Sequence, residues 1–450
     1  MATDEPPSLS QRAHYSPPWA NTSIIGIAGS SGSGKTSLAL AIIASLNLPW
    51  VVILSMDSYY KPLTPAQSRL AFANEFDFDS PDAIDFDILV CNLRAIQAGK
   101  KAEVPVYSFE KHARLPKTTS IYSPHVLILE GIFALHDPRV LSMLDLKVFA
   151  EADADLCLSR RLLRDVQSRG RDVSGCIKQW FKFVKPNFRK YVEPQRDLAD
   201  IIVPRGIENK VAIDMITSLI RRTLLQKSHL HTSHLASLSR LTRPHPLPDS
   251  ISTLPRTPQT RALTHTLTLP TTSRETFIHT FDRLATLLIE QALTYAPFVP
   301  HTVTTPTGHS YAGLTEEGEV STVLLLRGGS CLDTALRRSL PDCREGRLLI
   351  QTDHRTGEPA LHFRALPKDI ASHSLVLLLD AQMSSGGAAL MAVRVLVDHG
   401  VAEERIVLVA FEAGRDGVAR LVGVFPGVRV VVARLGGGEG RWVEGRYLGC

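Results

Sequence analysis

The stretch Gly29-Ser30-Ser31-Gly32-Ser33-Gly34-Lys35-Thr36 matches the pattern GxxxxGK[ST] without a mismatch. The apolar run before it (24–28) predicts a strand, and the run after it (37–46) predicts a helix. Glycines let the backbone curl until several amide N–H groups point at one anion, and the following helix adds its positive end. The stretch therefore predicts a phosphate-binding loop, with Lys35 on the β- and γ-phosphates and Thr36 on Mg²⁺. Alone, it indicates a nucleoside triphosphate and does not separate a kinase from an ATPase or a GTPase.

Length and composition set the outer bounds. With 450 residues, the chain exceeds what a single hydrophobic core usually organises, so two domains are expected. Its 44% hydrophobic and 21% charged residues are typical of a soluble globular protein. The formal charge is +5, and much of the basic excess lies in a Pro/Ser/Thr-rich middle segment with almost no acid. The sequence has no dense basic stripe with interleaved aromatics, so we expect no nucleic-acid partner.

The N-terminus and the cysteines bear on the cellular compartment. Residues 1–21 are polar and Pro-rich, lack the basic-then-apolar order of a signal peptide, and are expected to form a disordered leader. No apolar run approaches the length of a bilayer span, so no membrane partner is expected. Six cysteines are scattered without CxxC pairs, which predicts neither a zinc site nor a disulfide framework. A reduced, cytoplasmic protein is the simplest interpretation.

Short apolar runs alternate with helical stretches through the first half of the chain. The runs 50–57, 125–132 and 146–152 are short, continuous and apolar, as buried parallel strands are. This alternation predicts an α/β domain over residues 22–224, with a doubly wound parallel sheet of the P-loop NTPase type.

Residues 225–270 differ in character, since they are dense in Ser, Thr, Pro and His without a sustained period. We expect a linker there, which could run in two extended pieces. From Arg274 the apolar residues again fall at helical spacing, in an amphipathic helix that includes Phe277, Phe281 and Leu284. Five strand-like runs separated by helices follow, which predicts a second α/β domain over residues 271–450.

Charged side chains follow the predicted strands where a phosphoryl acceptor would bind. Asp57 ends the second strand, and ligands in open α/β sheets bind beyond the carboxyl ends of strands. An aspartate there can orient a hydroxyl and accept its proton, although Asp57 alone is equally explained as a helix cap or turn former. Glu130 ends another strand and, with Thr36 and Asp57, completes a predicted Mg²⁺ site. Residues 158–172 crowd five arginines together, which would neutralise charge on a transferring phosphoryl group.

In their order and spacing, the phosphate loop, the stretches 76–87 (FDFDSPDAIDFD) and 106–118 (VYSFEKHARLPKT) and the arginine cluster resemble the uridine/cytidine kinase family. The resemblance runs from about Ile24 to Ile216. It implies phosphorylation of uridine, and of cytidine, at the 5′-hydroxyl, with ATP as donor and Mg²⁺ as cofactor. The catalytic residues it implies are Lys35, Asp57 as the base, Arg164 and Arg169. The ATP ligands it implies are Gly29, Ser30, Ser31, Gly32, Ser33, Gly34, Lys35 and Thr36, with Arg169 and Arg171 as lid arginines.

The same resemblance implies a nucleoside pocket. Tyr60 would lie beside the acceptor, Asp79 would hold the ribose hydroxyls, and His112 would hydrogen-bond the pyrimidine. The full set implied for the nucleoside is Tyr60, Asp79, Tyr107, Phe109, His112, Arg161, Arg164 and Gln179. The chain departs from the family at Ser108, where an acid is common, and this change could loosen discrimination of the base.

The second domain resembles the uracil phosphoribosyltransferase fold over about residues 268–450. The resemblance implies a phosphoribosyl pyrophosphate site made of Arg327, Asp380, Ser384, Ser385, Gly386 and Gly387. Two departures argue against activity: Ala388 and Ala389 replace a hydroxyl residue of the phosphate loop, and Gly445 stands where the uracil-reading tail has an Asp. We therefore expect weak or no transferase activity and a role in regulation or assembly. Both families commonly form oligomers, so a homo-oligomer is expected.

Three alternatives remain open at this point. Another kinase on the same scaffold, such as a relative of phosphoribulokinase or pantothenate kinase, would not need an aromatic cage of Tyr107, Phe109 and His112. A nucleotide-binding regulatory protein would have no second substrate, and so no use for Asp57 and Asp79. A bifunctional enzyme would also make UMP from uracil and phosphoribosyl pyrophosphate.

Overall fold

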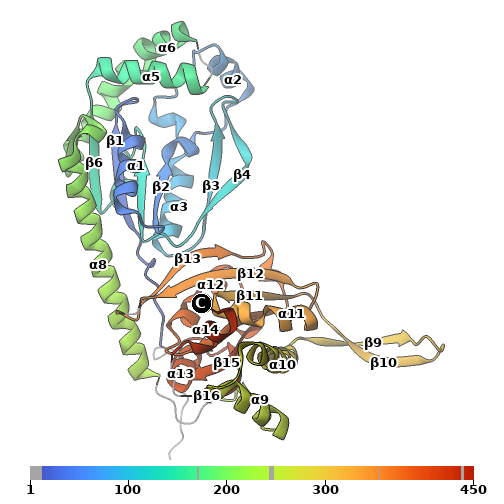
Figure 1. The fold of residues 1–450 in the computed structure, drawn as a ribbon. Coiled ribbons are helices and arrows are strands. Elements are labelled where there is room, and N and C mark those ends of the chain that lie inside the picture. Colours follow the sequence, from blue (N-terminus) through green and yellow to red (C-terminus); the bar gives the residue numbers. More distant parts are fainter. Residues whose placement is uncertain (1–12, 170–171, 243–247, 354, 437–439, 450) are drawn as a thin grey trace, which may run out of the picture. The chain divides into compact units, whose positions relative to one another are not determined.

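The computed structural model describes residues 13–169, 172–242, 248–353, 355–436 and 440–449. The chain divides into two compact units, one of residues 18–228 and one that joins the segment before residue 18 to residues 229–450. Each unit is built from helices packed on a parallel or largely parallel sheet (Figure 1), which confirms the predicted α/β class. No helix within the described residues is long and apolar enough to cross a membrane.

A five-stranded sheet organises the first unit, in the order β2-β5-β1-β6-β7 with every pairing parallel. The central strand β1 is buried along its whole length. Its side chains alternate between two cores: Ile25 and Ile27 pack with helix α1, and Ile24 and Ala28 pack with helix α3. The strands are β1 Ser23–Gly29, β2 Val51–Ser55, β5 Val126–Glu130, β6 Leu146–Glu151 and β7 Ile201–Pro204.

The helices of the first unit and a separate hairpin complete it. The hairpin pairs β3 and β4 antiparallel outside the main sheet. Its strands are β3 Ala102–Ser108 and β4 Ala113–Ile121. The helices are α1 Lys35–Leu46, α2 Pro65–Phe72, α3 Phe86–Gln97, α4 Pro138–Leu141, α5 Ala154–Arg169, α6 Val173–Gln179 and α7 Lys185–Asn187. Helix α8, Lys210–Leu241, begins in this unit, and its residues from His229 onward belong to the second unit.

The three strands that carry candidate site residues end at the same level. Glu130 of β5 pairs in register with Ile27 of β1 on one side and with Ser55 of β2 on the other. The phosphate loop follows β1 directly, and Asp57 lies two residues beyond Ser55 in the 3₁₀ turn Met56–Tyr59. Parallel pairing therefore brings the loop, Asp57 and Glu130 to one edge of the sheet, where such folds bind ligands.

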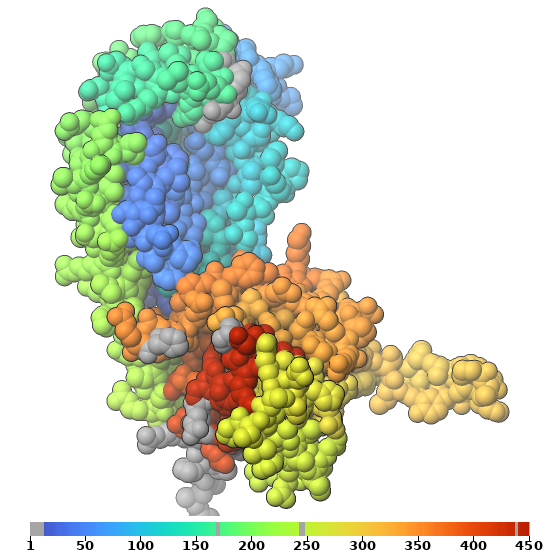
Figure 2. All heavy atoms as spheres, viewed as in Figure 1, coloured from blue at the N-terminus to red at the C-terminus, as the bar shows by residue number. Residues whose placement is uncertain are grey.

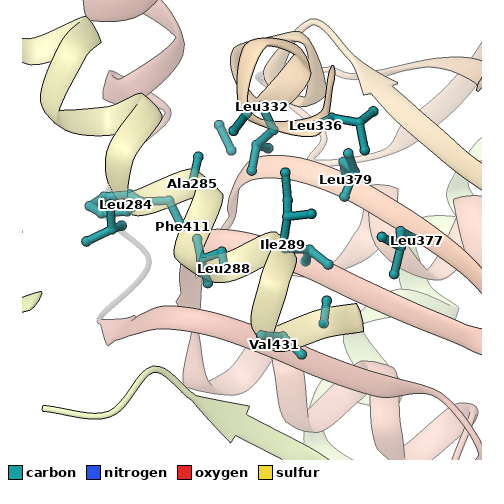
Figure 3. Close-up of a cluster of buried hydrophobic side chains, with 14 of the residues drawn as sticks. Leu284, Ala285, Leu288, Ile289, Leu332, Leu336, Leu377, Leu379, Phe411 and Val431 are labelled. Carbon is teal, nitrogen blue, oxygen red and sulfur yellow. The ribbon is translucent and has the colours of Figure 1, made fainter. Parts of the chain in front are cut away.

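The second unit contains a seven-stranded sheet in the order β13-β12-β11-β14-β15-β16-β8. Within it, β12 pairs antiparallel with β13 and the other pairings are parallel. Helix α10 packs Leu284, Leu288 and Ile289 into a cluster that includes Leu379 of β14 and Phe411 of β15 (Figure 3). The strands are β8 Ile251–Thr253, β11 Val320–Leu326, β12 Arg344–Thr352, β13 Pro359–Ala365, β14 Leu375–Met383, β15 Ile406–Gly414 and β16 Arg429–Gly436. The helices are α9 Pro258–Thr268, α10 Arg274–Leu293, α11 Asp333–Ser339, α12 Gly387–Asp398, α13 Arg415–Val424 and α14 Trp442–Leu448.

A second antiparallel hairpin projects from the body of this unit (Figure 2). It consists of β9, Phe298–Thr304, and β10, Ser310–Glu316, and most of its side chains are exposed. Neither hairpin was expected from the sequence.

The structure differs from the linker expected over residues 225–270. Helix α8 continues to Leu241, β8 pairs with β16, and residues 258–268 form α9. The helix is stable here because His231, Leu235 and Leu238 recur at helical spacing and are buried, so tertiary packing outweighs the weak local preference of Ser, Thr and His.

The expected disorder of the leader 1–21 is wrong for the residues that the structure describes there. Tyr15 and Trp19 are 1% and 0% exposed. The Tyr15 hydroxyl is 3.1 Å from Nε2 of His231, and the Trp19 ring packs edge-on against Tyr122. Large aromatic side chains contribute enough buried apolar area to order such a segment. Residues 1–12 lie outside the described residues.

Candidate active site

The phosphate loop has the backbone that its glycines predict. Gly32 and Gly34 have φ of +87° and +91°, in the region that favours glycine. A Cβ at Gly32 would lie 2.2 Å from the backbone oxygen of Cys157, so a larger residue does not fit. Helix α1 begins at Lys35, whose ammonium group donates to the backbone oxygen of Ser30 at 2.8 Å. The loop is thus closed around its lysine and followed by a helix N-terminus, as anion binding requires.

Lys35 and Glu130 form a buried pair of opposite charge behind the loop. They are 8% and 4% exposed. Burial lowers the pKa of Lys35 and raises the pKa of Glu130, and each group opposes the shift of the other. The hydroxyls of Thr36 and Ser55 also hydrogen-bond Glu130. Two hard oxygen donors, the Thr36 hydroxyl and the Glu130 carboxylate, therefore lie together, and this donor set fits Mg²⁺.

Asp57 faces the same cavity from the end of β2. Lys35, Thr36, Asp57 and Glu130 all line it. The Asp57 amide is 3.4 Å from the Ser55 hydroxyl oxygen, which caps the 3₁₀ turn. The backbone of Asp57 is thus used in the turn, while its carboxylate faces the phosphate side of the cavity.

Aromatic rings form the opposite wall of this cavity. The ring centroids of Tyr60 and Tyr107 are 5.2 Å apart, and those of Tyr60 and Phe109 are 6.4 Å apart. The His112 imidazole stacks on Phe78 with a centroid distance of 5.1 Å and an angle of 18°. His112 lies in the β3–β4 turn and has a left-handed backbone conformation, with φ of +47°. A flat, partly polar ring would find both stacking and hydrogen-bonding groups here.

Buried charges lie between the phosphate loop and the aromatic wall. Arg161, from α5, is 6% exposed and donates to the Ser31 hydroxyl at 2.9 Å. Its guanidinium nitrogens are 3.5 Å from Asp79 and 3.6 Å from Asp165. Arg164 binds Asp165 at 2.9 Å. Asp165 therefore fixes both arginines, and Arg161 in turn fixes Asp79 beside the loop.

The structure brings most of the predicted site residues to one cavity. Gln179 joins it from α6 and donates to Asn74 at 3.1 Å. The side chain of Arg169 and the whole of Arg171 lie outside the described residues, so their role as lid arginines stays a prediction. The predicted residues that line the cavity are Ser31, Lys35, Thr36, Asp57, Tyr60, Asp79, Tyr107, Phe109, His112, Glu130, Arg161, Arg164 and Gln179.

Sequence reasoning missed several residues of this cavity. Phe76, Phe78 and Phe183 line it, and Asp165 and Asn74 hold its arginines and glutamine. The concentration of Phe and Asp in 76–79 was a usable signal, because aromatic and acidic side chains gathered in one short segment are typical of a ligand-binding loop.

The phosphate loop, the charged residues next to it and the aromatic wall line one cavity. This arrangement defines the first unit as a P-loop phosphotransferase with a pocket for a small acceptor. The sequence model of the Phosphoribulokinase / Uridine kinase family matches residues 24–212, and the model of uracil phosphoribosyltransferase matches residues 254–437.

Relatives match nearly the whole chain. A Mus musculus protein named uridine-cytidine kinase-like 1 is 44% identical over 441 residues, covering 95% of this chain and 80% of the relative. A uridine kinase of Schizosaccharomyces pombe is 43% identical, covering 94% of this chain and 93% of the relative. A uridine kinase of Saccharomyces cerevisiae is 40% identical, with coverages of 97% and 91%. The chain belongs to the phosphoribulokinase/uridine kinase family.

The residues predicted to bind phosphoribosyl pyrophosphate lie in the second unit, and two of them form ion pairs there. Ser384, Ser385 and Gly386 form the turn between β14 and α12, with Gly386 at φ +79° and Gly387 as the first residue of the helix. Arg327 binds Glu444 at 3.1 Å, and Asp380 binds Arg441 at 3.4 Å. Burial raises the pKa of Asp380 to about 6, and Arg441 opposes that shift. Groups of the C-terminal segment therefore pair with both charged side chains that were predicted to bind phosphoribosyl pyrophosphate.

Proposed function

We propose that the chain transfers the γ-phosphoryl group of ATP to the 5′-hydroxyl of uridine and of cytidine, giving UMP and CMP. The observation that carries the proposal is the shared cavity: residues of the phosphate loop, Asp57 and the aromatic residues Tyr60, Tyr107, Phe109 and His112 all line it, so a donor phosphate and a nucleoside would be held next to each other. The names of the relatives support the choice of a pyrimidine nucleoside as acceptor. We assign the kinase to the predicted domain 22–224.

On the donor side, loop amides and Lys35 would bind the β- and γ-phosphates. Thr36 and Glu130 would hold Mg²⁺, with Asp57 nearby, and the ion would neutralise charge on the phosphates. The buried ammonium of Lys35 already has the carboxylates of Glu130 and Asp57 near it, and a bound phosphate would add further negative charge, which favours its charged form. Arg164, and the predicted lid arginines Arg169 and Arg171, would add positive charge around the transferred group.

On the acceptor side, Asp57 would accept the proton of the 5′-hydroxyl as that oxygen attacks the γ-phosphorus, and ADP would leave. Asp79 and Arg161 would hold the ribose hydroxyls. Tyr107, Phe109 and His112 would enclose the base. Because both substrates would already be held in position, the entropy cost of bringing them together would be met on binding and would not add to the barrier of the transfer step.

The test is a nucleoside panel with Mg·ATP, in which ADP and nucleoside monophosphate are both quantified. We expect equal amounts of ADP and UMP with uridine, and turnover with cytidine. Failure with both pyrimidine nucleosides, together with turnover of another hydroxyl substrate, would refute the assignment and favour a different kinase on this scaffold.

For the second unit we propose little or no uracil phosphoribosyltransferase activity. The pairs Arg327–Glu444 and Asp380–Arg441 support this, because a phosphoribosyl ligand would first have to break them. The decisive assay is UMP formation from uracil and phosphoribosyl pyrophosphate, and robust turnover would contradict the proposal. Cytoplasmic location and homo-oligomerisation remain predictions.

A further inference from the structure

The second unit contains a basic cavity that neither candidate site uses. Its volume is about 600 Å³, which is within the range of small-molecule sites. It is lined by helix α9, strand β8, one residue of α10, the first residue of α13 and the end of β16. Its basic side chains are Arg256, Arg261, His265, Arg415 and Arg434. Arg327 and Asp380 and the turn 384–387 do not line it.

The charge in this cavity is largely uncompensated. The side chains of Arg256, Arg261 and Arg415 make no hydrogen bond or ion pair with any residue that the structure describes, and Arg434 is 3.3 Å from Glu412. None of the described lining residues is acidic. Like charges that gather without partners repel one another, so an anion that binds among them gains attraction and relieves that repulsion.

The basic residues come from three parts of the chain that folding brings together. Arg256 and Arg261 belong to the Ser/Thr/Pro-rich segment 225–270, in which basic residues outnumber acidic ones. The structure places strand β8 and helix α9 in this segment. Arg415 follows β15 directly, and Arg434 lies near the end of β16. The carboxyl ends of parallel strands are where open α/β sheets bind ligands.

One face of α9 adds polar groups that are not charged. Thr260, Thr264 and Thr268 line the cavity at a spacing of one helical turn. The hydroxyls of Thr264 and Thr268 donate to backbone oxygens one turn earlier, at 2.8 and 3.1 Å. These hydroxyls donate their hydrogens to the helix backbone and keep acceptor capacity, which suits a ligand that carries hydroxyl or amino groups beside its anionic part.

We propose that this cavity is a binding site for the polyphosphate group of a small organic ligand, separate from the kinase site and from the phosphoribosyl candidate residues. The shared chemistry is a chain of two or three phosphates attached to a polar body. A nucleoside triphosphate and a sugar pyrophosphate both carry it. Arginine is suited to this ligand, because its planar fork binds phosphate oxygens in pairs.

The test uses the full chain with Lys35→Ala, which weakens the phosphate loop as a competing site. Inorganic tripolyphosphate, ATP and phosphoribosyl pyrophosphate are titrated separately by calorimetry. A double variant, Arg256→Glu with Arg261→Glu, is compared with the control Arg283→Glu, which changes an exposed arginine of the neighbouring helix α10 outside the cavity. Circular dichroism and thermal unfolding verify that each variant is folded.

We expect tripolyphosphate to bind the Lys35→Ala chain, and the double variant to weaken that binding about tenfold or more. The control should change binding by less than about twofold, because it reverses one exposed charge outside the cavity and removes no contact with the ligand. If ATP binds more tightly than phosphoribosyl pyrophosphate, the ligand class is a nucleoside triphosphate; the reverse order indicates a sugar pyrophosphate. Absence of binding to the Lys35→Ala chain, or equal binding by the double variant and the control, would overturn the proposal.

Discussion

The substitution Asp380→Asn should stabilise the second unit at neutral pH. Asp380 is 2% exposed, and burial raises its pKa from 3.8 to about 6 although Arg441 opposes the shift. The folded state therefore holds a proton on this carboxyl at pH values where the unfolded chain has lost it. Stability contributed by this group is highest below pH 4 and falls as the pH rises through the window from about 4 to 6.

The magnitude follows from the size of the shift. A rise of roughly two units corresponds to about 3 kcal/mol of folding free energy lost at pH 7. Asparagine does not ionise, so position 380 in the variant makes no pH-dependent contribution to the folding free energy in this window. The gain at pH 7 is at most about 3 kcal/mol, because the variant also gives up its ion pair with the half-exposed Arg441.

Native-state hydrogen exchange of peptides from β14 measures this directly, since the strand lies in the middle of the sheet. The variant should show higher protection than the wild type at pH 7 and nearly equal protection at pH 4. The exposed residue Asp342 supplies the control Asp342→Asn, which should match the wild type at both values. A variant that is less stable than the wild type at pH 7, or a difference that does not change with pH, would refute the reasoning.

Three further predictions concern the first unit. His112→Ala removes a ring of the aromatic wall and should raise KM for uridine about tenfold, leaving KM for ATP unchanged in steady-state assays; equal effects on both would place His112 elsewhere. Lys35→Met should lower kcat at least about 100-fold, because it removes the charge aimed at the transferred phosphates; near-normal turnover would contradict the loop assignment. Arg161→Met should lower the free energy of urea unfolding by about 3 kcal/mol, since buried Asp165 loses one of its two arginine partners; an unchanged midpoint would show that Arg164 suffices.

The phosphate loop and the sheet were predictable because their signals are local. Buried parallel strands leave short apolar runs in the sequence, and the loop motif contains every residue type that its geometry needs. The hairpin β3–β4 was not predictable in the same way. Its strands are half exposed, and His112 in its turn is left-handed and stacks on Phe78, which lies 34 positions earlier in the sequence.

Contacts between distant residues were beyond the reach of sequence patterns. Asp380 and Arg441 are separated by 61 positions, and the fold alone brings them together. The helical course of residues 225–241 had a readable signal in the spacing of His231, Leu235 and Leu238, but the Ser/Thr/His-rich composition obscured it. Composition reports average tendencies, whereas burial of a few well-spaced residues decides the structure.

The central claim is that Asp57 acts as the base for a nucleoside acceptor. Its most direct test is single-turnover transfer from Mg·ATP to uridine by the wild type and by Asp57→Asn, with ATP binding measured in parallel. We predict a loss of about 10²–10⁴-fold in the rate of UMP formation, because a general base contributes that much, with ATP affinity changed by less than about threefold. A loss below about tenfold would contradict the assignment of Asp57, and wild-type protein that forms no UMP would contradict the proposed function itself.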